Sequence, residues 1–267
     1  MVNSPSWEKN LRDFPRQIKN LELSNELKHD VPFIPASDLG SQYYCEKKVD
    51  LSREIGERET QAKNIGKEGH EKLMEYTEEV SLEEVIEKIK LGNIYHLRES
   101  PVVGIFEDVP FGGFPDDIIF YRQKPILVGD LRITGRDSLW PGRDKKVQVK
   151  VYCLALDQMG FDCSKLKGMI GVEHARAREE LEIIPYREHL HLLTRELQLE
   201  GEIVEKNPFD EKGLYKPHFF EYNRQDTLED FEWAIDYWLG KRNPIPTKKA
   251  GKCKACEYKE DCSDSKI

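Results

Sequence analysis

The sequence predicts a mixed α/β fold with helical parts at both ends. Residues 100–134 are rich in Val, Ile and Phe and are broken by Gly and Pro at short intervals, which is typical of strands joined by tight turns. Helix-start signals mark the first hundred residues, and apolar residues recur at intervals of three and four near the C-terminus. A helix that crosses between two groups of strands indicates a sheet covered by helices.

Helices are predicted first, over residues 37–56, 59–80 and 81–92. Ser37 and Asp38 are good N-cap residues for the first of these. The third opens with S-x-x-E, the spacing of a capping box, and Gly92 is expected to end it.

Strands and further helices follow. The middle of the chain predicts strands at roughly 100–108, 110–121 and 125–134, then a helix of about fourteen residues within 144–161. Two more strands are predicted over 166–175 and 179–186, and two amphipathic helices over 188–206 and 227–242. The segment 205–225 is either a substrate-channel loop or a connector.

The chain is long enough, at 267 residues, for one large domain or two small ones. We expect one domain over 1–267, with a helical part at 1–99, a core at 100–200 and a C-terminal part at 201–267. The net charge of −9 argues against a general nucleic-acid coat but does not exclude a local basic groove. Basic residues cluster at 142–150 and 241–254, where they form either such a groove or solvated surface.

No apolar run approaches the length that a bilayer requires, so no membrane association is expected. The N-terminus has no apolar segment after its charges and does not look like a secretory signal. We therefore expect a cytoplasmic protein, in which thiols stay reduced and clustered cysteines indicate metal rather than disulfides.

Carboxylates stand at informative places on two of the predicted strands. Asp116 and Asp117 follow a Gly-Pro turn at the start of one strand, and Asp130 lies within the next. A hairpin-length turn joins these strands, so Asp116 and Asp130 should lie close together. Paired carboxylates can hold Mg²⁺ for phosphodiester cleavage. The alternative is that they belong to a turn and to a solvated strand face.

Two polar residues share one face of the predicted crossing helix. Gln148 and Tyr152 are four positions apart on a helix that is otherwise largely apolar. They form either a functional polar pair or simply the edge of the helix.

Three cysteines close the chain with the spacing C-x2-C-x5-C, at Cys253, Cys256 and Cys262. Three thiolates are an incomplete set for tetrahedral zinc or for an iron–sulfur cluster. A fourth ligand is therefore expected from elsewhere in the chain.

The order of these features resembles the PD-(D/E)XK nuclease superfamily, and within it the RecB-like nucleases with an iron–sulfur cluster. It is most similar to the CRISPR-associated exonuclease family and is also similar to the nuclease domains of AddB and Dna2. The likeness runs from about residue 33 to 262. The matching features, in chain order, are Cys45, Gly66 and His70 in G-x3-H, Gly113 to Asp116 in "GFPD", Asp130, Gln148 and Tyr152 in Q-x3-Y, and the terminal cysteines.

The resemblance implies a restriction-endonuclease-like core, a mixed central sheet flanked by helices, whose two helical ends are joined by a metal cluster. His70, Asp116 and Asp130 would bind Mg²⁺ or Mn²⁺. Cys45 would be the fourth cluster ligand, for a [4Fe–4S] cluster or, alternatively, for zinc. Cys153 and Cys163 are interpreted as ordinary thiols.

One catalytic position departs from the family pattern. The resemblance calls for a lysine two residues after Asp130, and this sequence has Arg132, which is not a conservative replacement. Arg132 takes the lysine's role, or Lys145 or Lys150 reaches the site from the following helix, or hydrolysis has been lost. Lys145 shares the helix face of Gln148, whereas Lys150 points aside.

These features together predict a metal-dependent DNA exonuclease that acts on single-stranded ends. Asp116, Asp130, Arg132, Gln148 and Tyr152 would form its catalytic set. The resemblance implies a role in CRISPR adaptation, trimming new fragments beside the integrase proteins, or in DNA repair. The alternative is a catalytically silent, cluster-bearing DNA-binding or scaffold protein. A zinc-stapled structural protein unrelated to nucleic acid is a third, weaker interpretation.

Overall fold

The computed structural model describes residues 6–22, 27–60, 80–209 and 213–267. The described elements, in chain order, are α1 (Ser6–Glu22), the short 3₁₀ helix η1 (Lys28–Asp30), β1 (Ile34–Pro35), α2 (Ala36–Ile55), α4 (Leu82–Lys90), β2 (Tyr95–Arg98), β3 (Val102–Phe106), β4 (Val109–Gly113), β5 (Asp117–Tyr121), β6 (Lys124–Thr134), α5 (Gly142–Gln158), β7 (Lys167–His174), α6 (Ala177–Leu181), α7 (Pro185–Glu200), β8 (Tyr215–Glu221), α8 (Arg224–Trp238) and α9 (Ala250–Lys254).

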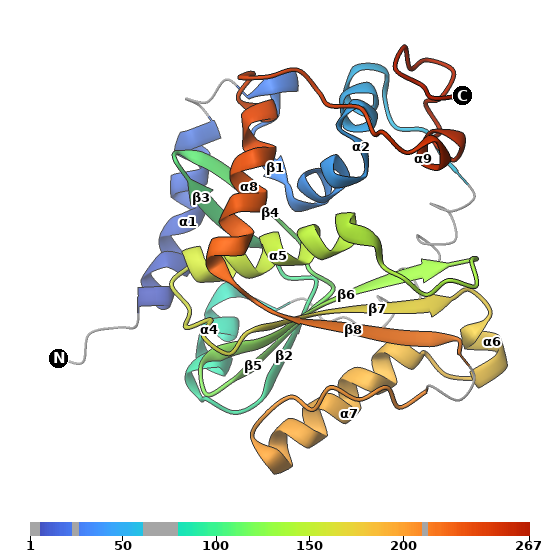
Figure 1. The fold of residues 1–267 in the computed structure, drawn as a ribbon. Coiled ribbons are helices and arrows are strands. Elements are labelled where there is room, and N and C mark those ends of the chain that lie inside the picture. The colour runs from blue at the N-terminus through green and yellow to red at the C-terminus, as the bar shows by residue number, and fades with distance from the viewer. Residues whose placement is uncertain (1–5, 23–26, 61–79, 210–212) are drawn as a thin grey trace.

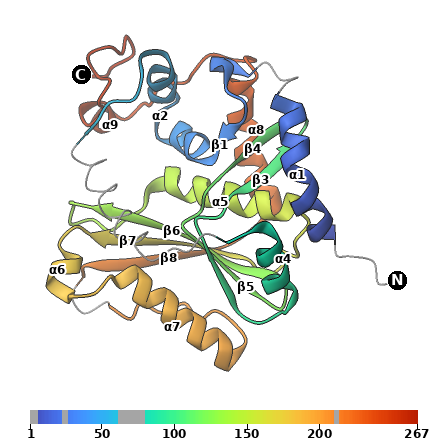
Figure 2. The ribbon, with the colours of Figure 1, turned by 180° about the vertical axis from the view of Figure 1, so that it is seen from behind.

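A mixed five-stranded sheet forms the centre, in the order β2-β5-β6-β7-β8. β6 pairs parallel with β7, and the other neighbours pair antiparallel. Helix α5 covers one face of this sheet and α7 covers the other, while α1, α2 and α8 lie beyond α5 (Figures 1 and 2). A smaller sheet, β1-β4-β3, packs on the α5 side. The expected α/β core with a mixed sheet flanked by helices is therefore confirmed.

Strand β6 divides the apolar interior into two cores by alternation. Val128 belongs to the large core that contains the apolar residues of α5, whereas Leu127 and Leu131 belong to the smaller core under α7. Successive side chains of a strand point to opposite faces, so Asp130 shares the α5 face with Val128. This alternation aims Asp130 at the helix that carries Gln148 and Tyr152.

Helix α4 follows its sequence signals closely. The Ser81 side chain accepts a hydrogen bond from the backbone N of Glu84, and Gly92 has a φ of +72° directly after the helix. The Ser81 half of the predicted capping box and the glycine stop are both confirmed.

The predicted strand over 179–186 is wrong. Residues up to Leu181 form α6, Glu182 takes a left-handed φ of 56°, and Pro185 begins α7 at the first helical position, where its fixed φ is favourable. The buried Glu173 carboxylate accepts a hydrogen bond from the backbone N of Tyr186 and so secures the start of α7.

The predicted strand over 110–121 is two strands in different sheets. β4 pairs with β3 and β1, whereas β5 pairs with β2 and β6, and the chain leaves the sheet between them around Pro115. The central sheet also takes β2 and β8 from outside the expected core of 100–200, so segment 205–225 contains a strand. No helix in the described ranges is long and apolar enough to cross a membrane.

Candidate active site and cysteine pocket

Asp116 and Asp130 lie together at one end of the β5–β6 hairpin. The register pairs Asp117 with Gly129, which places Asp116 beside Asp130, and the Asp116 carboxylate accepts a hydrogen bond from the backbone N of Leu131. The pKa of Asp116 is raised well above its usual value, first by burial and then by the charge of Asp130. Two such carboxyl groups favour a shared proton or a bound cation between them.

Asp130 keeps one oxygen without a hydrogen bond. Its side chain is 3% exposed, and the buried Oδ2 accepts no hydrogen bond from the described part of the chain. The Nζ of Lys145 on α5 lies 3.4 Å from this oxygen. An orphaned buried carboxylate oxygen fits a divalent cation, because such ions take oxygen ligands.

A chain of polar groups runs from Asp130 along α5. Lys145 Nζ donates to Gln148 Oε1 at 3.0 Å, and Gln148 Nε2 donates to the Tyr152 hydroxyl at 2.8 Å. Burial, and then the charge of Asp130, raise the pKa of Tyr152, so its hydroxyl keeps its proton. Gln148 and Tyr152 therefore belong to one hydrogen-bonded network, and Lys145 is the member of that network nearest the two aspartates.

The glycine of "GFPD" makes room for this chain. A Cβ added at Gly113 would lie 3.0 Å from the Tyr152 ring. The Tyr152 ring thus packs on bare backbone just before the turn that leads to Asp116.

The guanidinium of Arg132 points away from the acid pair. Arg132 lies two residues after Asp130 on the same face of β6, but its guanidinium donates to the backbone carbonyl of Pro141 at the start of α5. Lys150 is directed away as well, since its Nζ lies 2.6 Å from Asp226 and 2.8 Å from Asp230 on α8. Of the two lysines considered for the missing position, only Lys145 is beside the acids.

The predicted metal ligand His70 and the neighbouring Gly66 lie outside the described residues.

Asp117, next to Asp116, faces the other side of the sheet. There the His96 Nε2 lies 2.6 Å from Asp117 Oδ1 and links β2 to β5. His96 was not singled out from the sequence, because nothing in the neighbouring residues indicates pairing with a distant acid.

The four predicted cluster cysteines line one small pocket. Cys45 comes from α2, and Cys253, Cys256 and Cys262 come from α9 and the segment after it; all four are free thiols. Cys45 interrupts α2 with extended backbone angles, φ −171° and ψ 114°, and its Sγ accepts a hydrogen bond from the backbone N of Thr247 at 3.3 Å. Four thiols on one pocket fit the donor set of an iron–sulfur cluster or of structural zinc. Within the described ranges, no three His, Cys, Asp or Glu side chains are gathered as a ready single-ion site.

Buried polar contacts hold the C-terminal segment against α2. Glu46, which is 0% exposed, accepts two hydrogen bonds from Arg242, at 2.5 and 2.7 Å, and a third from the backbone N of Ile245 at 2.8 Å. Lys252 Nζ donates to the carbonyls of Tyr43 and Tyr44, just before the interruption of α2 at Cys45. These contacts hold α9 and the C-terminal segment beside α2 (Figures 1 and 2).

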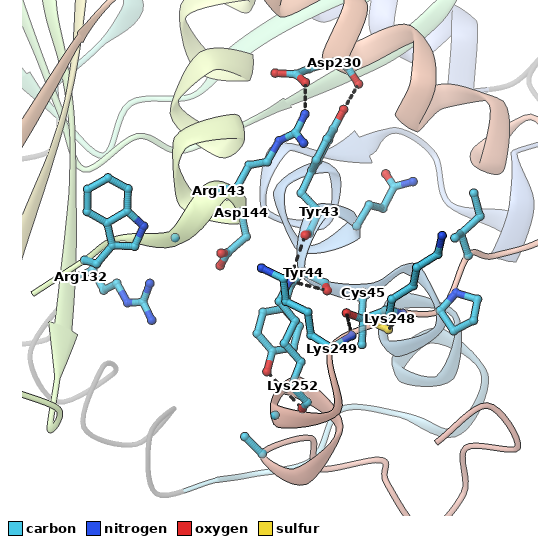
Figure 3. A pocket seen from close by; sticks show the side chains of 18 of the residues that line it. Tyr43, Tyr44, Cys45, Arg132, Arg143, Asp144, Asp230, Lys248, Lys249 and Lys252 are labelled. Carbon is cyan, nitrogen blue, oxygen red and sulfur yellow. Dashed lines mark hydrogen bonds and ion pairs between the residues drawn. The ribbon is translucent and has the colours of Figure 1, made fainter. Parts of the chain in front are cut away.

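A larger pocket, of about 1090 Å³, lies between the cysteines and the end of β6 (Figure 3). Its lining includes Cys45 on one side and Arg132 on the other. Its ionisable side chains are mostly basic: Arg132, Arg136, Arg143, Lys248, Lys249 and Lys252 against Asp144, Glu229 and Asp230. The two basic clusters noted in the sequence thus contribute to one hollow, and the exposed Trp140 on its rim was not singled out from the sequence.

Comparison with known proteins supports a nuclease relationship. No family model matches the chain. The chain is 26% identical over 213 residues to Exonuclease V of Danio rerio, a match that covers 66% of this chain and 53% of that protein. The chain therefore spans about half the length of the curated relative it matches, and the match indicates distant homology to a PD-(D/E)XK nuclease family. The expected likeness to the CRISPR-associated family stays a prediction.

Among solved structures, the crystal structure of SSO0001 superposes with a TM-score of 0.48 at 15% sequence identity. The superposition covers 95% of this chain and 98% of that one.

Proposed function

We propose that this protein is a metal-dependent deoxyribonuclease that hydrolyses phosphodiester bonds at single-stranded DNA ends. The observation that carries the proposal is the buried carboxylate pair, in which Asp130 keeps an unsatisfied oxygen 3.4 Å from Lys145. Its distant homology to Exonuclease V adds independent support.

Asp116 and Asp130 would hold Mg²⁺ or Mn²⁺, together with His70, which lies outside the described residues. When bound, such a cation lowers the pKa of a water and offsets negative charge on the scissile phosphate. The raised pKa of Asp116 means that this carboxyl gives up its proton most readily when a cation replaces it.

Lys145 takes the role that the family pattern gives to the strand lysine. Its ammonium lies beside the acid pair, and Gln148 and Tyr152 hold it in place through their hydrogen bonds. From there it would orient the attacking water and stabilise charge that develops on the phosphate. Arg132 acts as a positioning residue, since it fixes the loop from which α5 and Lys145 begin.

Cys45, Cys253, Cys256 and Cys262 would hold a [4Fe–4S] cluster, with zinc as the alternative. Bound there, the group supplies a cross-link between residues more than two hundred positions apart, which restricts the unfolded chain. The setting we propose is the cytoplasm, in CRISPR adaptation beside the integrase proteins or in DNA repair.

A second candidate function is a catalytically silent DNA-binding or scaffold protein. Arg132 favours it, because this arginine stands in the lysine position and donates to a backbone carbonyl instead of facing the acids. The two candidates differ in whether Lys145 supports hydrolysis.

The test is cleavage of end-labelled single-stranded DNA with Mn²⁺, using anaerobically prepared protein that keeps its metal content. We expect Asp130→Ala to abolish cleavage and Lys145→Ala to lower the rate by about 10²–10³-fold, the usual effect of losing one charge-stabilising donor. Lys146→Ala is the matched control, because this lysine is the next residue on α5 and its Nζ lies over the Phe220 ring, away from the acids.

The possible outcomes distinguish the nuclease from the catalytically silent DNA-binding or scaffold protein. Loss of cleavage in Lys145→Ala with full activity in Lys146→Ala supports Lys145 as the working cation. A native protein that is silent while Arg132→Lys cuts DNA would establish the second candidate. Cleavage that survives Asp130→Ala would overturn the proposed active site.

A further inference from the structure

Trp140 lies exposed on the loop between β6 and α5. Its side chain is 68% exposed, and its ring meets His218 edge-on, with centroids 5.2 Å apart and planes at 86°. His218 Nε2 is bonded to the carbonyl of Leu139 at 2.7 Å, which fixes the loop next to the tryptophan. A large apolar ring is thus held firmly while a face of it stays open to solvent.

The pocket beside this ring contains cations of two kinds. Arg132, Arg143 and Lys252 bond to other residues of the protein. The side chains of Arg136, Lys248 and Lys249 are exposed and make no hydrogen bond or ion pair with any described residue. On a chain with a net charge of −9, three uncommitted cations around one hollow are a local feature and not a consequence of composition.

The acid pair lies close to this pocket, although neither Asp116 nor Asp130 lines it. Arg132 lines it and lies two residues from Asp130 on one face of β6, a separation of about 7 Å along a strand. Figure 3 shows Arg132 across the hollow from Lys248, Lys249 and Lys252, with Arg143 and Asp144 between them. A polymer bound in the pocket would therefore pass close to the carboxylates.

We propose that this pocket binds single-stranded DNA, with a base stacked on Trp140 and backbone phosphates on Arg136, Lys248 and Lys249. Aromatic rings and uncommitted cations along one hollow are the combination that tracks an unpaired strand. A duplex keeps its bases stacked on one another, so an isolated ring selects unpaired bases. This inference rests on the proposed nuclease function and adds the site that receives the strand.

The test measures binding and not cleavage, so that the two proposals can fail separately. Anaerobically prepared full-length protein is titrated into a labelled oligothymidylate in EDTA, and anisotropy gives the affinity. A second ligand of equal length carries abasic sugars, which keep the phosphates and remove the stacking bases. The variants are Trp140→Ala, Trp140→Tyr and the double change Lys248→Ala/Lys249→Ala, and each is checked for native thermal unfolding.

Trp140→Ala is expected to weaken oligothymidylate binding about tenfold and to leave abasic binding within about twofold, whereas Trp140→Tyr restores most of the loss. The double lysine variant is expected to weaken both ligands and to reduce the salt dependence of binding by about 1.4 in log–log slope. Lys9→Ala is the control, because this exposed lysine lies on α1, on the other side of the molecule from α9 (Figures 1 and 2).

Equal losses on both ligands for Trp140→Ala, or no loss on either, would overturn the stacking site. If the native protein nevertheless cleaves single-stranded DNA in the separate assay with Mn²⁺, the nuclease proposal stands and only this inference fails. If the native protein neither binds nor cleaves single-stranded DNA, both fail. Tight binding without cleavage supports this site and overturns the catalytic proposal.

Discussion

Asp50 on α2 and Asp116, just before β5, are both partly or fully buried, but their surroundings shift their pKa values in opposite directions. Burial alone would raise the pKa of Asp50, yet hydrogen bonds from Lys28, Lys47 and Tyr237 outweigh it and lower the pKa to about 2. Asp116 has one backbone donor and faces a second carboxylate, and its pKa is raised. One carboxyl is therefore held charged, and the other is held ready to exchange its proton.

The same contrast separates the helical part from the acid site as a whole. Near the cysteine pocket, buried Glu46 accepts hydrogen bonds from Arg242, from the Gln42 side chain and from the backbone N of Ile245. At the acid pair, Asp130 Oδ2 accepts no hydrogen bond from the described residues, although the Lys145 ammonium lies 3.4 Å away. Buried polar groups with a full set of hydrogen-bond partners contribute to stability. A buried polar group without such partners lowers stability, and its position is one where a ligand is expected to bind. Three predictions test this division.

The largest effect is expected from Arg242→Met, which leaves the Glu46 carboxylate buried without its cation. Breaking a buried pair in this way should lower the free energy of unfolding by about 3 kcal/mol. That loss corresponds to a fall in melting temperature of roughly 6–12 °C, measured by calorimetry. Arg224→Met is the matched control, because its 3.5 Å pair with Asp157 is on the surface, and it should change stability by less than about 1 kcal/mol. Equal losses of stability in the two variants would contradict a stabilising role for the buried Glu46–Arg242 pair.

A smaller pair of effects with opposite signs is expected from two Asp→Asn changes. Asp50→Asn should lower stability at neutral pH by about 1–2 kcal/mol, because its depressed pKa makes the charged form the stabilising one. That contribution is present above the unfolded pKa near 4 and is lost as pH falls toward 2, so the variant and the native protein should converge in acid. Asp130→Asn should leave the metal-free protein equally or more stable, since it removes repulsion with Asp116.

Urea unfolding of both variants at pH 7, and of Asp50→Asn down to pH 2, measures these differences. Destabilisation of the metal-free protein by Asp130→Asn to the extent seen for Asp50→Asn would erase the distinction between the two regions.

The smallest effects are expected from two Tyr→Phe changes. The Tyr258 hydroxyl is buried, donates to the carbonyl of Gly56 at 2.9 Å and accepts from the backbone N of Arg58 at 3.2 Å. Its loss should cost about 1 kcal/mol of stability without altering the rate of cleavage. Tyr152→Phe should instead lower the rate, because the hydroxyl anchors Gln148 and, through it, Lys145. Melting curves and cleavage rates of both variants test this contrast between an effect on stability and an effect on catalysis. It is contradicted if Tyr258→Phe slows cleavage more than Tyr152→Phe does.

The sequence was most informative where the relevant residues are close in the chain. Ser81 and Gly92 bound α4 as predicted, because capping depends on a few neighbouring backbone groups. The meeting of Asp116 and Asp130 could also be predicted, since a short turn joins their strands. The strand predicted over 179–186 failed because the buried Glu173 and Pro185, which favour a helix start there, act through tertiary packing and backbone geometry and not through apolar alternation.

The sequence by itself determined helix α4 with its two end signals, the helix that crosses between strands, the acid pair and the spacing of the terminal cysteines. Only the tertiary structure decided that Lys145 stands beside Asp130 while Lys150 pairs with α8, and that Arg132 turns to the Pro141 carbonyl. It also placed Cys45, which the resemblance had suggested as the fourth ligand, on the pocket of the other three cysteines, and it alone joined the basic clusters around Trp140. The physical reason is that periodicity and capping are local properties of a chain, whereas the partner of a long charged side chain depends on which elements pack across from it.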